Sequence, residues 1–442
     1  MLLYNLRLAW KSVRRYPVLS ALILLGIALG VGVSTTFITA YHVLARDPVP
    51  GKSDSLYYVR MNSWGVADDP FLKTPPPVTT WRDAQALQKS RIPARSTATF
   101  ASRVTVFPSG GASPLRQSVR LTTTDLFPMF AAPFRYGGPW SREADARPEM
   151  VAVIGSALND RLFGGANSVG RTIRVEKQEM RIVGVLAPWR PRVRAYAPLS
   201  DPMAAPEPLF IPLALAGPME ISPAELQMNW RTPAPGEEKL PYTSQLMINE
   251  ALFVELWAEL PTPEAAKAYK SFVDAYVSEQ KKLGRFPHPL NNRVTSLLDL
   301  MEEWNVVPPQ TKALAAISLL FLVVAALNLI GLFLGKFLSR AATVGVRRAL
   351  GASRWAIFVQ HLVECELMGL AGGVVGVFFA LGGLAVLNRV YGDGPEGVAF
   401  FQLDIPMVLA AVALSLAAGA IAGLYPAWRI CAIPPARHLK SQ

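Results

Sequence analysis

Hydrophobic positions along this chain are concentrated in four long runs. Uncharged, mainly apolar stretches occupy residues 16–45, 313–335, 367–388 and 405–428. Each run reaches or exceeds the roughly 20 residues that a helix needs to cross a bilayer. The pattern therefore predicts four transmembrane helices, which we assign to residues 18–45, 313–338, 361–389 and 405–428.

Residues 46–312, between the first two runs, have the mixed composition of a globular domain. A strand, a helix and a strand are predicted near its start, at 56–61, 80–90 and 98–107. The same order recurs near its end, at 251–260, 262–283 and 293–297, with Thr262 as the helix cap. Short apolar strands are predicted between these triplets, at 151–154, 171–175 and 181–186. The proline-dense stretch 188–241 shows no period that assigns an element.

The two triplets lie next to the first and second transmembrane runs. We therefore predict a membrane-proximal β-α-β subdomain built from residues 46–117 and 245–300, with a mainly-β subdomain at 118–244 inserted in it. The predicted fold class is an α-helical membrane protein with four transmembrane helices and a large α+β domain between helices 1 and 2.

The N-terminal residues 1–17 have an amphipathic pattern. Leu2, Leu6 and Trp10 fall on one helical face, with Arg7 and Lys11 on the other. This predicts a helix on the inner membrane surface. A secretory signal peptide is the alternative, but the apolar run that follows is about twice the length of a signal h-region.

Basic residues predict the orientation. Residues 1–45, 336–360 and 428–442 contain 12 basic residues and no Asp or Glu, which accounts for the whole formal charge of +12. By the positive-inside rule these segments, both termini included, are cytoplasmic, and residues 46–312 and the short loop 390–404 lie outside. The remaining chain has equal numbers of basic and acidic residues, so no basic face remains for nucleic acid.

Motifs for catalysis are absent from the sequence. It has no G-x-x-x-x-G-K-[ST], H-E-x-x-H or C-x-x-C pattern, and its four histidines are scattered. We therefore expect no catalytic residue, no metal site and no ATP hydrolysis by a P-loop of this chain. Cys365 and Cys431 both lie outside residues 46–312, so no disulfide is expected in that domain.

Glu364 and Glu366 are acidic residues at the start of the third predicted span. An acid within a membrane can serve a proton relay. Both residues lie near the membrane edge, however, so we predict a structural ion pair with Arg347, Arg348 or Arg354.

Three further residues are predicted to serve helix packing within the membrane. Gly26 and Gly30 belong to a face of small residues that allows close approach of another helix, within the chain or across a dimer. Asn328, in the middle of the second span, is predicted to make an interhelical hydrogen bond rather than a substrate contact.

The stretch between the second and third spans, TVGVRRALGASRWAIFVQ at 343–360, is basic and acid-free. Thr343 is expected to cap a short helix that ends at Gly351, and Ser353 to begin the next helix. The apolar positions of the short helix fall on one face, at Val346, Ala349 and Leu350. An ordinary positive-inside loop is the alternative.

Three stretches resemble a known family, the MacB-like permeases of ABC transporters, with their FtsX-type permease domain. The first is VAVIGSALNDRLFGGANSVG at 151–170, continued by RTIRV at 171–175 and RIVGV at 181–185. The others are GVRRALGAS followed by LVE at 362–364, and GLYPAWRICAIPPA at 423–436. The chain departs from the family at Thr343, where Glu is usual, and at Gly137-Gly138, where Gly-Arg is common.

The resemblance implies a permease subunit that converts ATP hydrolysis by a separate ATPase into a periplasmic conformational change, called mechanotransmission. It implies export of a periplasmic substrate from the bacterial inner membrane, by a homodimer or heterodimer of permeases, with a periplasmic adaptor and an outer-membrane duct. ATP and Mg²⁺ would bind the ATPase, and this chain no cofactor. The coupling site would comprise Val344, Gly345, Val346, Arg347, Arg348, Ala349, Leu350, Gly351, Ala352 and Ser353. Lipoprotein release, or activation of a cell-wall hydrolase by an FtsX-like transducer, are the alternatives.

Overall fold

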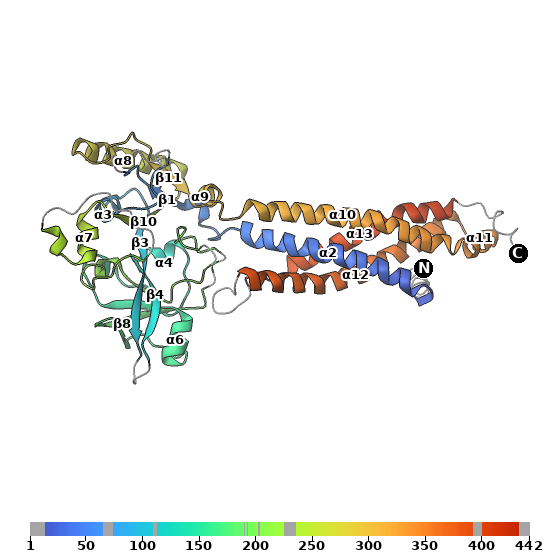
Figure 1. The fold of residues 1–442 in the computed structure, drawn as a ribbon, viewed down its shortest axis with the longest axis horizontal. Helices are drawn as coiled ribbons and strands as arrows, with labels where there is room; N and C mark the ends of the chain where they lie inside the picture. The colour runs from blue at the N-terminus through green and yellow to red at the C-terminus, as the bar shows by residue number, and fades with distance from the viewer. Residues whose placement is uncertain are drawn as a thin grey trace. The chain divides into compact units, whose positions relative to one another are not determined.

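The computed structural model describes residues 14–64, 74–108, 113–189, 191, 193–201, 204–224, 236–391 and 400–432. They form two compact units, one of helices and one built on a sheet (Figure 1). The sheet unit comprises essentially residues 47–306, and the helical unit the parts of the chain before and after it. The predicted amphipathic helix at 1–17 lies largely outside the described residues.

The helical unit contains four helices long and apolar enough to cross a membrane, which confirms the predicted four spans. They are α2 (Pro17–Ala45), α10 (Pro309–Leu338), α12 (Arg354–Tyr391) and α13 (Ile405–Cys431). A proline lies in the first turn of α2, α10 and α13, where a missing N–H is no loss. A short helix, α11 (Ala341–Ala349), lies between α10 and α12.

Helix α12 runs without interruption for 38 residues from Arg354 and includes the predicted third span, 361–389. The backbone N–H of Ala356 donates to Ser353 Oγ at 3.1 Å, so Ser353 caps this helix as predicted.

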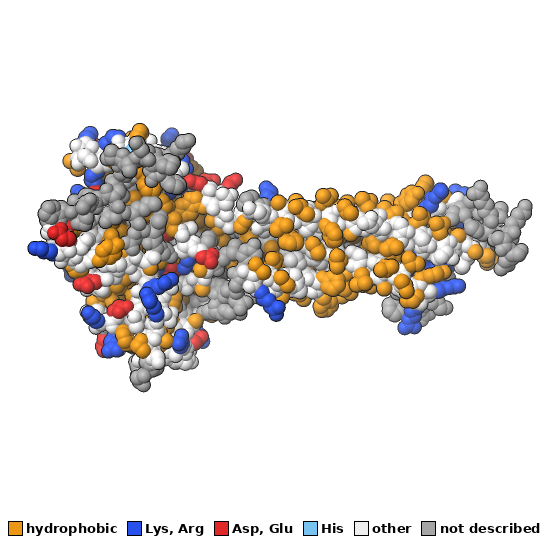
Figure 2. Space-filling view, viewed as in Figure 1, with side chains coloured by type: hydrophobic (Ala, Val, Ile, Leu, Met, Phe, Trp, Pro, Cys, Tyr) orange, Lys and Arg blue, Asp and Glu red, His pale blue; other side chains and the backbone are white. Residues whose placement is uncertain are grey.

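Helix α2 contacts each of the other three spans, and α13 contacts both α10 and α12. Many apolar side chains point away from this bundle, and Figure 2 shows them in orange, interspersed with white, along its length. Such a surface is compatible with lipid and unfavourable in water.

The sheet unit is organised on one sheet of eleven described strands. Its main path follows the order β11-β1-β10-β3-β4-β9-β6-β8-β5, with β2 on β10 and β7 on β3 and β8. The strands of the predicted triplets are β1 (Leu56–Arg60), β3 (Arg95–Phe107), β10 (Leu252–Glu259) and β11 (Arg293–Ser296). The others are β2 (Thr79–Thr80), β4 (Leu115–Thr122), β5 (Phe134–Gly137), β6 (Val151–Ile154), β7 (Thr172–Val175), β8 (Gln178–Leu186) and β9 (Leu209–Pro212).

The predicted division into two subdomains is only partly seen, because strand β3 joins them. The first half of β3 pairs with β10, and its last residues pair with β7 of the predicted insertion. Its other edge pairs with β4 along most of its length. At 13 residues β3 is long enough to serve both parts, and a single sheet results (Figure 1).

Apolar cores cover both faces of this sheet. One contains α3 (Trp81–Gln88) and the long helix α8 (Pro263–Lys282), which buries Tyr269, Val273 and Val277. Thr262 caps α8 as predicted, accepting from the N–H of Ala265. The other core includes α9 (Leu297–Glu303) and α4 (Leu126–Met129). The remaining helices are α5 (Arg142–Ala146), α6 (Ser156–Phe163) and α7 (Tyr242–Ile248).

A buried cluster of charges connects three strands of the sheet. Arg120 of β4 is fully buried and lies 2.8 Å from Glu207, just before β9, and 2.7 Å from Glu255 of β10. Arg194 also contacts Glu207, at 3.1 Å. Burial alone would raise the pKa of Glu207, but the positive charges of Arg120 and Arg194 hold it below its usual value. The cluster is thus balanced in charge and holds this part of the sheet together.

Candidate functional site

The predicted coupling segment forms the short helix α11 and the turn that follows it. The helix begins at Ala341 after Arg340, so Thr343 lies inside it and is not its cap, contrary to the prediction. Its end is as predicted: Gly351 has a φ of +98°, and its N–H donates to the carbonyl of Arg348. A left-handed residue of this kind commonly ends a helix, and glycine adopts the conformation without strain.

Helix α11 has two apolar faces that lie in different surroundings. Ala341 and Val344 are buried in a cluster with Phe337 of α10 and Ile357 of α12. The predicted apolar face, Val346, Ala349 and Leu350, points away from that cluster. Val346 is 48% exposed and Leu350 is 83% exposed. A short helix is therefore anchored on one side and presents an uncovered apolar face on the other.

The two arginines of α11 bind neighbouring helices of the same chain. Arg347 Nη1 donates to Gln360 Oε1 of α12 at 2.6 Å, and Arg348 Nη1 donates to the carbonyl of Cys431 in α13 at 3.3 Å. The cluster around Phe337 supplies the contact with α10. Helix α11 is thus joined to the ends of three of the spans.

Glu364 forms the predicted kind of ion pair, but with other partners. Its Oε1 lies 2.9 Å from Lys336 Nζ, and its Oε2 lies 3.4 Å from Arg340 Nη1. His361 Nδ1 is 3.9 Å from the same Oε2. Among the described residues, the salt bridges of Glu364 are with these side chains and not with the predicted Arg347, Arg348 or Arg354. Lys336 is fully buried and Glu364 is 2% exposed. Each charge therefore interacts with the other in place of the water it has lost.

Glu366 does not join this ion pair. It is half-buried and lies on the side of α12 that faces Gly419 of α13. Within the described part of the chain, no salt bridge is formed by its carboxylate. The prediction of an ion pair therefore holds for Glu364 and not for Glu366.

Two of the three predicted packing residues lie at helix contacts inside this chain. A methyl group on Gly26 would lie 3.0 Å from Leu329 Cδ2, and one on Gly30 would lie 2.8 Å from Leu322 Cδ1. Both glycines therefore allow α2 to approach α10 closely. Asn328 points outward from α10 instead, and among the described residues it has no side-chain hydrogen bond. Its predicted interhelical bond does not form within one copy of the chain.

An apolar cavity of about 400 Å³ lies beside the beginning of α12 and the end of α13. Trp355, Phe358 and Trp428 line it, together with Arg354. Trp355 is 71% exposed and Trp428 is 60% exposed. Large aromatic side chains at a helix end are typical of the boundary between membrane and water.

Lys336 is the site residue that the sequence analysis missed. It was counted only as one of the basic residues after the second span. Its position in the last turn of an apolar helix, with an acid near the start of the next span, is the signal that could have identified it. No group of three or more His, Cys, Asp or Glu side chains suited to a metal occurs among the described residues.

Comparisons with known proteins match both units of the chain. The family model of the MacB-like periplasmic core domain matches residues 20–228, and that of the FtsX-like permease C-terminal domain matches residues 315–435.

Similar curated proteins include two kinds of ATP-binding and permease protein. A macrolide export protein MacB of Syntrophobacter fumaroxidans is 23% identical over 66% of this chain and 43% of its own length. The pyoverdine export protein PvdT of Pseudomonas aeruginosa is 24% identical over 72% of this chain and 41% of its own length. A PvdT of Pseudomonas fluorescens is 24% identical over 100% of this chain and 60% of its own length. The chain thus spans about two fifths to three fifths of these relatives.

Proposed function

This chain belongs to the MacB-like permeases of ABC transporters, since it joins a MacB-like periplasmic core domain to an FtsX-like permease domain, and we propose that α11 is where a separate ATPase acts on it. ATP and Mg²⁺ would bind that ATPase. The permease would carry the resulting motion to its periplasmic domain and so drive a substrate outward.

The exposed apolar face of α11 is the observation that carries this proposal. Val346, Ala349 and Leu350 lie on a helix in a basic, acid-free segment, which the positive-inside rule places in the cytoplasm. An apolar side chain such as Leu350 gains about 1.5–3 kcal/mol when a partner removes it from water. A cytoplasmic protein with an apolar groove is therefore a partner that this face suits.

The contacts of α11 explain how a docked ATPase could move the membrane helices. Displacement of α11 is resisted by the cluster at Phe337, by the Arg347 bond to α12 and by the Arg348 bond to α13. Force on α11 therefore reaches three spans together. Two of these, α10 and α12, are continuous helices of 30 and 38 residues, which can transmit an axial or tilting movement over their length.

The remaining partners and the substrate follow from the relatives. We propose that two permease chains work together, as a homodimer or with a paralogue, and that Asn328 faces the second permease chain. Because the relatives are named as exporters of a macrolide and of pyoverdine, we propose export of a periplasmic substrate from the bacterial inner membrane. A periplasmic adaptor and an outer-membrane duct would complete the path.

Replacement of Val346 and Leu350 by Asp tests the docking site. These side chains are exposed, so V346D/L350D should insert and fold normally, yet two buried charges should weaken ATPase binding more than tenfold. The measurements are co-purification with an ABC ATPase of the same organism and its ATP turnover in nanodiscs. L350M, which keeps an apolar side chain, should behave as wild type.

Charge reversal at Arg347 and Arg348 is a weaker test, because both side chains hold α11 to the chain itself. Unchanged binding and turnover in V346D/L350D would overturn the docking proposal. Binding lost equally in V346D/L350D and L350M would also contradict it, since the apolar character of the face would then not matter.

A further inference from the structure

A gap in the sheet lies beside the middle of strand β3. On the edge of β3 opposite β4, β10 pairs as far as Thr99, and Ala101 accepts from the N–H of Ala224. Further along the same edge, the carbonyl of Thr105 accepts from the N–H of Glu176. Of the residues whose backbone groups point to this edge, only Arg103 lies between these two contacts.

The alternation of an antiparallel strand gives the direction of the Arg103 backbone. The carbonyls of residues 101 and 105 of β3 accept hydrogen bonds on the edge opposite β4, so the backbone groups of residue 103 between them point to that same edge. Its N–H and C=O therefore face the gap. In the described part of the chain, neither group has a hydrogen-bond partner. An unpaired donor and acceptor on a sheet edge form a template for another extended segment.

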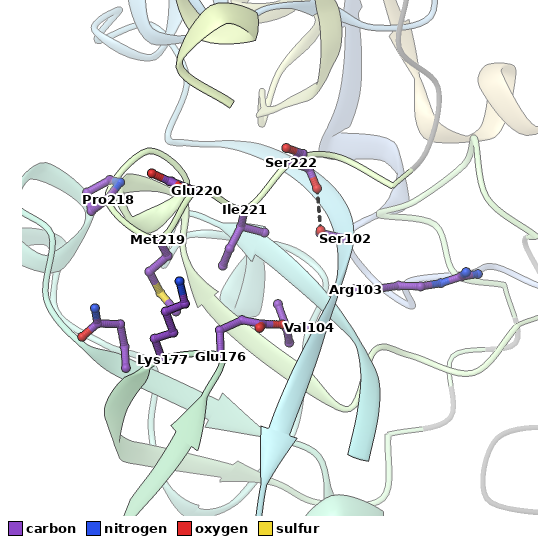
Figure 3. A pocket seen from close by; sticks show the side chains of 11 residues that line it. Ser102, Arg103, Val104, Glu176, Lys177, Pro218, Met219, Glu220, Ile221 and Ser222 are labelled. Carbon is purple, nitrogen blue, oxygen red and sulfur yellow. Dashed lines mark hydrogen bonds between the residues drawn. The ribbon is translucent and has the colours of Figure 1, made fainter. Parts of the chain in front are cut away.

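A cavity of about 490 Å³ occupies this gap (Figure 3). It is bounded by Ser102–Val104 of β3, by the turn at Glu176–Gln178 and by the loop at Pro218–Ser222. The loop is held to the strand because Ser102 Oγ donates to the carbonyl of Ser222 at 2.5 Å. The volume of the cavity lies in the range of pockets that bind small ligands.

The charged side chains around the cavity favour a positively charged occupant. Glu176 and Glu220 contribute two carboxylates and Lys177 one ammonium group, while the side chain of Arg103 extends away from the other lining residues (Figure 3). Glu176 Oε1 accepts from the N–H of Thr105 at 2.6 Å, which fixes that carboxylate beside the strand. Glu220 lies on the opposite loop and is exposed.

We propose that this cavity binds an extended peptide segment that pairs with the backbone of Arg103 and places a basic side chain near Glu176 or Glu220. The residue opposite Arg103 would accept from its N–H and donate to its C=O, as in an antiparallel sheet. The two neighbouring residues of the segment would direct their side chains to the same face as Ser102 and Val104. That face lines the cavity, so the side chains at these two positions would lie near the carboxylates of Glu176 and Glu220. The inference does not depend on ATPase docking at α11.

Three capped tripeptides test both parts of the proposal with the full chain in nanodiscs. Acetyl-Lys-Val-Lys-amide should bind in isothermal titration calorimetry. Its analogue with N-methylated valine lacks the central donor and should bind about fivefold or more weakly. Acetyl-Glu-Val-Glu-amide, with the opposite charge, should bind more weakly still. Equal binding of the first two peptides would overturn the backbone pairing, and equal binding of the Lys and Glu peptides would overturn the charge preference.

Variants of the protein provide the matched comparison. R103P removes the N–H that faces the gap but no N–H of the β3–β4 ladder, so it should fold and lose peptide binding. R103A keeps the backbone donor and should bind as wild type. E220Q should reduce the preference for Lys over Glu, and K177Q should increase it. Loss of binding in R103A to the level of R103P would contradict the proposal.

We assign the segment to a loop of a partner protein, and a photo-crosslinker placed at Gln178 in living cells tests this source. A crosslinked product larger by the mass of a protein, which R103P abolishes, supports the proposal. A product larger by only a few hundred daltons indicates a free peptide and contradicts the assignment to a partner. Crosslinking that persists in R103P would contradict it.

Discussion

The carboxylate of Glu364 is shielded from water and held between two basic side chains of neighbouring segments. Glu364 is an ion-paired acid at the start of a span, as expected, but its partners are Lys336 and Arg340. The prediction considered the arginines nearest in the sequence. The reversal of the chain through α11 decides the partner instead, because it brings side chains of the last turn of α10 within reach of side chains early in α12. The order of the arginines along the chain does not indicate that contact, whereas the position of Lys336 in the last turn of an apolar span does.

Asp145 of the sheet unit is a residue whose role no sequence pattern indicated. Its carboxylate accepts from the N–H of Thr124 at 3.0 Å and from Trp140 Nε1 at 2.8 Å. Burial nevertheless raises its pKa to about 6, because these hydrogen bonds only partly replace water. A partly buried acid of this kind makes the stability of the sheet unit depend on pH.

Replacement of Asp145 by Asn should remove part of that pH dependence. Since the pKa is higher in the folded than in the unfolded chain, the protonated acid stabilises the fold at low pH, and this contribution is lost as pH rises through about 6. The thermal midpoint of wild type should therefore fall relative to D145N between about pH 4 and about pH 6. E149Q, an exposed substitution nearby, is the control, and parallel pH profiles of wild type and D145N would contradict the assignment.

Secondary-structure elements were predictable where they are long or strongly periodic. The four spans, α8 and the strands of both terminal triplets follow directly from apolar runs or alternation. Strand β9 did not, because its four residues LFIP are all buried and follow a proline-rich stretch without a period. Its place between β4 and β6 depends on pairing with distant strands.

The ion pair between α10 and α12 gives a prediction about these two helices. Replacement of Glu364 by Gln leaves Lys336, which is fully buried, without its nearest counter-charge. Removing one partner of a buried pair typically destabilises a protein by about 3–5 kcal/mol. E364Q should therefore lower the thermal midpoint of the helical unit in detergent, as followed by tryptophan fluorescence.

Two further variants separate the loss of the ion pair from a general effect of the substitution. K336M/E364Q removes both charges and should recover most of the stability lost in E364Q. E366Q changes a half-buried acid on the same helix that forms no salt bridge among the described residues, and it should have a smaller effect. Equal destabilisation by E364Q and E366Q would show that the buried pair is not what stabilises this contact.

At the scale of the whole molecule, the sequence predicted the class of the protein and the structure revised its internal divisions. Hydropathy and charge gave four spans and a large domain, and the family models agree. The two predicted subdomains of that domain share one sheet through β3, a long-range pairing that periodicity cannot reveal. The uncovered face of α11 likewise required the structure, because only the structure distinguishes its buried side from its exposed one.

Site-specific photo-crosslinking from Leu350 tests the central claim most directly. A benzoylphenylalanine at this position, which directly follows α11 and is 83% exposed, should capture an ABC ATPase in intact cells. The product is identified by mass spectrometry, and the same probe at Val344, which is buried in the chain, should give no such product. An ATPase crosslinked from Leu350 and not from Val344 is the predicted result. A product formed only with lipid or with periplasmic proteins would contradict both the docking site and the orientation of the chain.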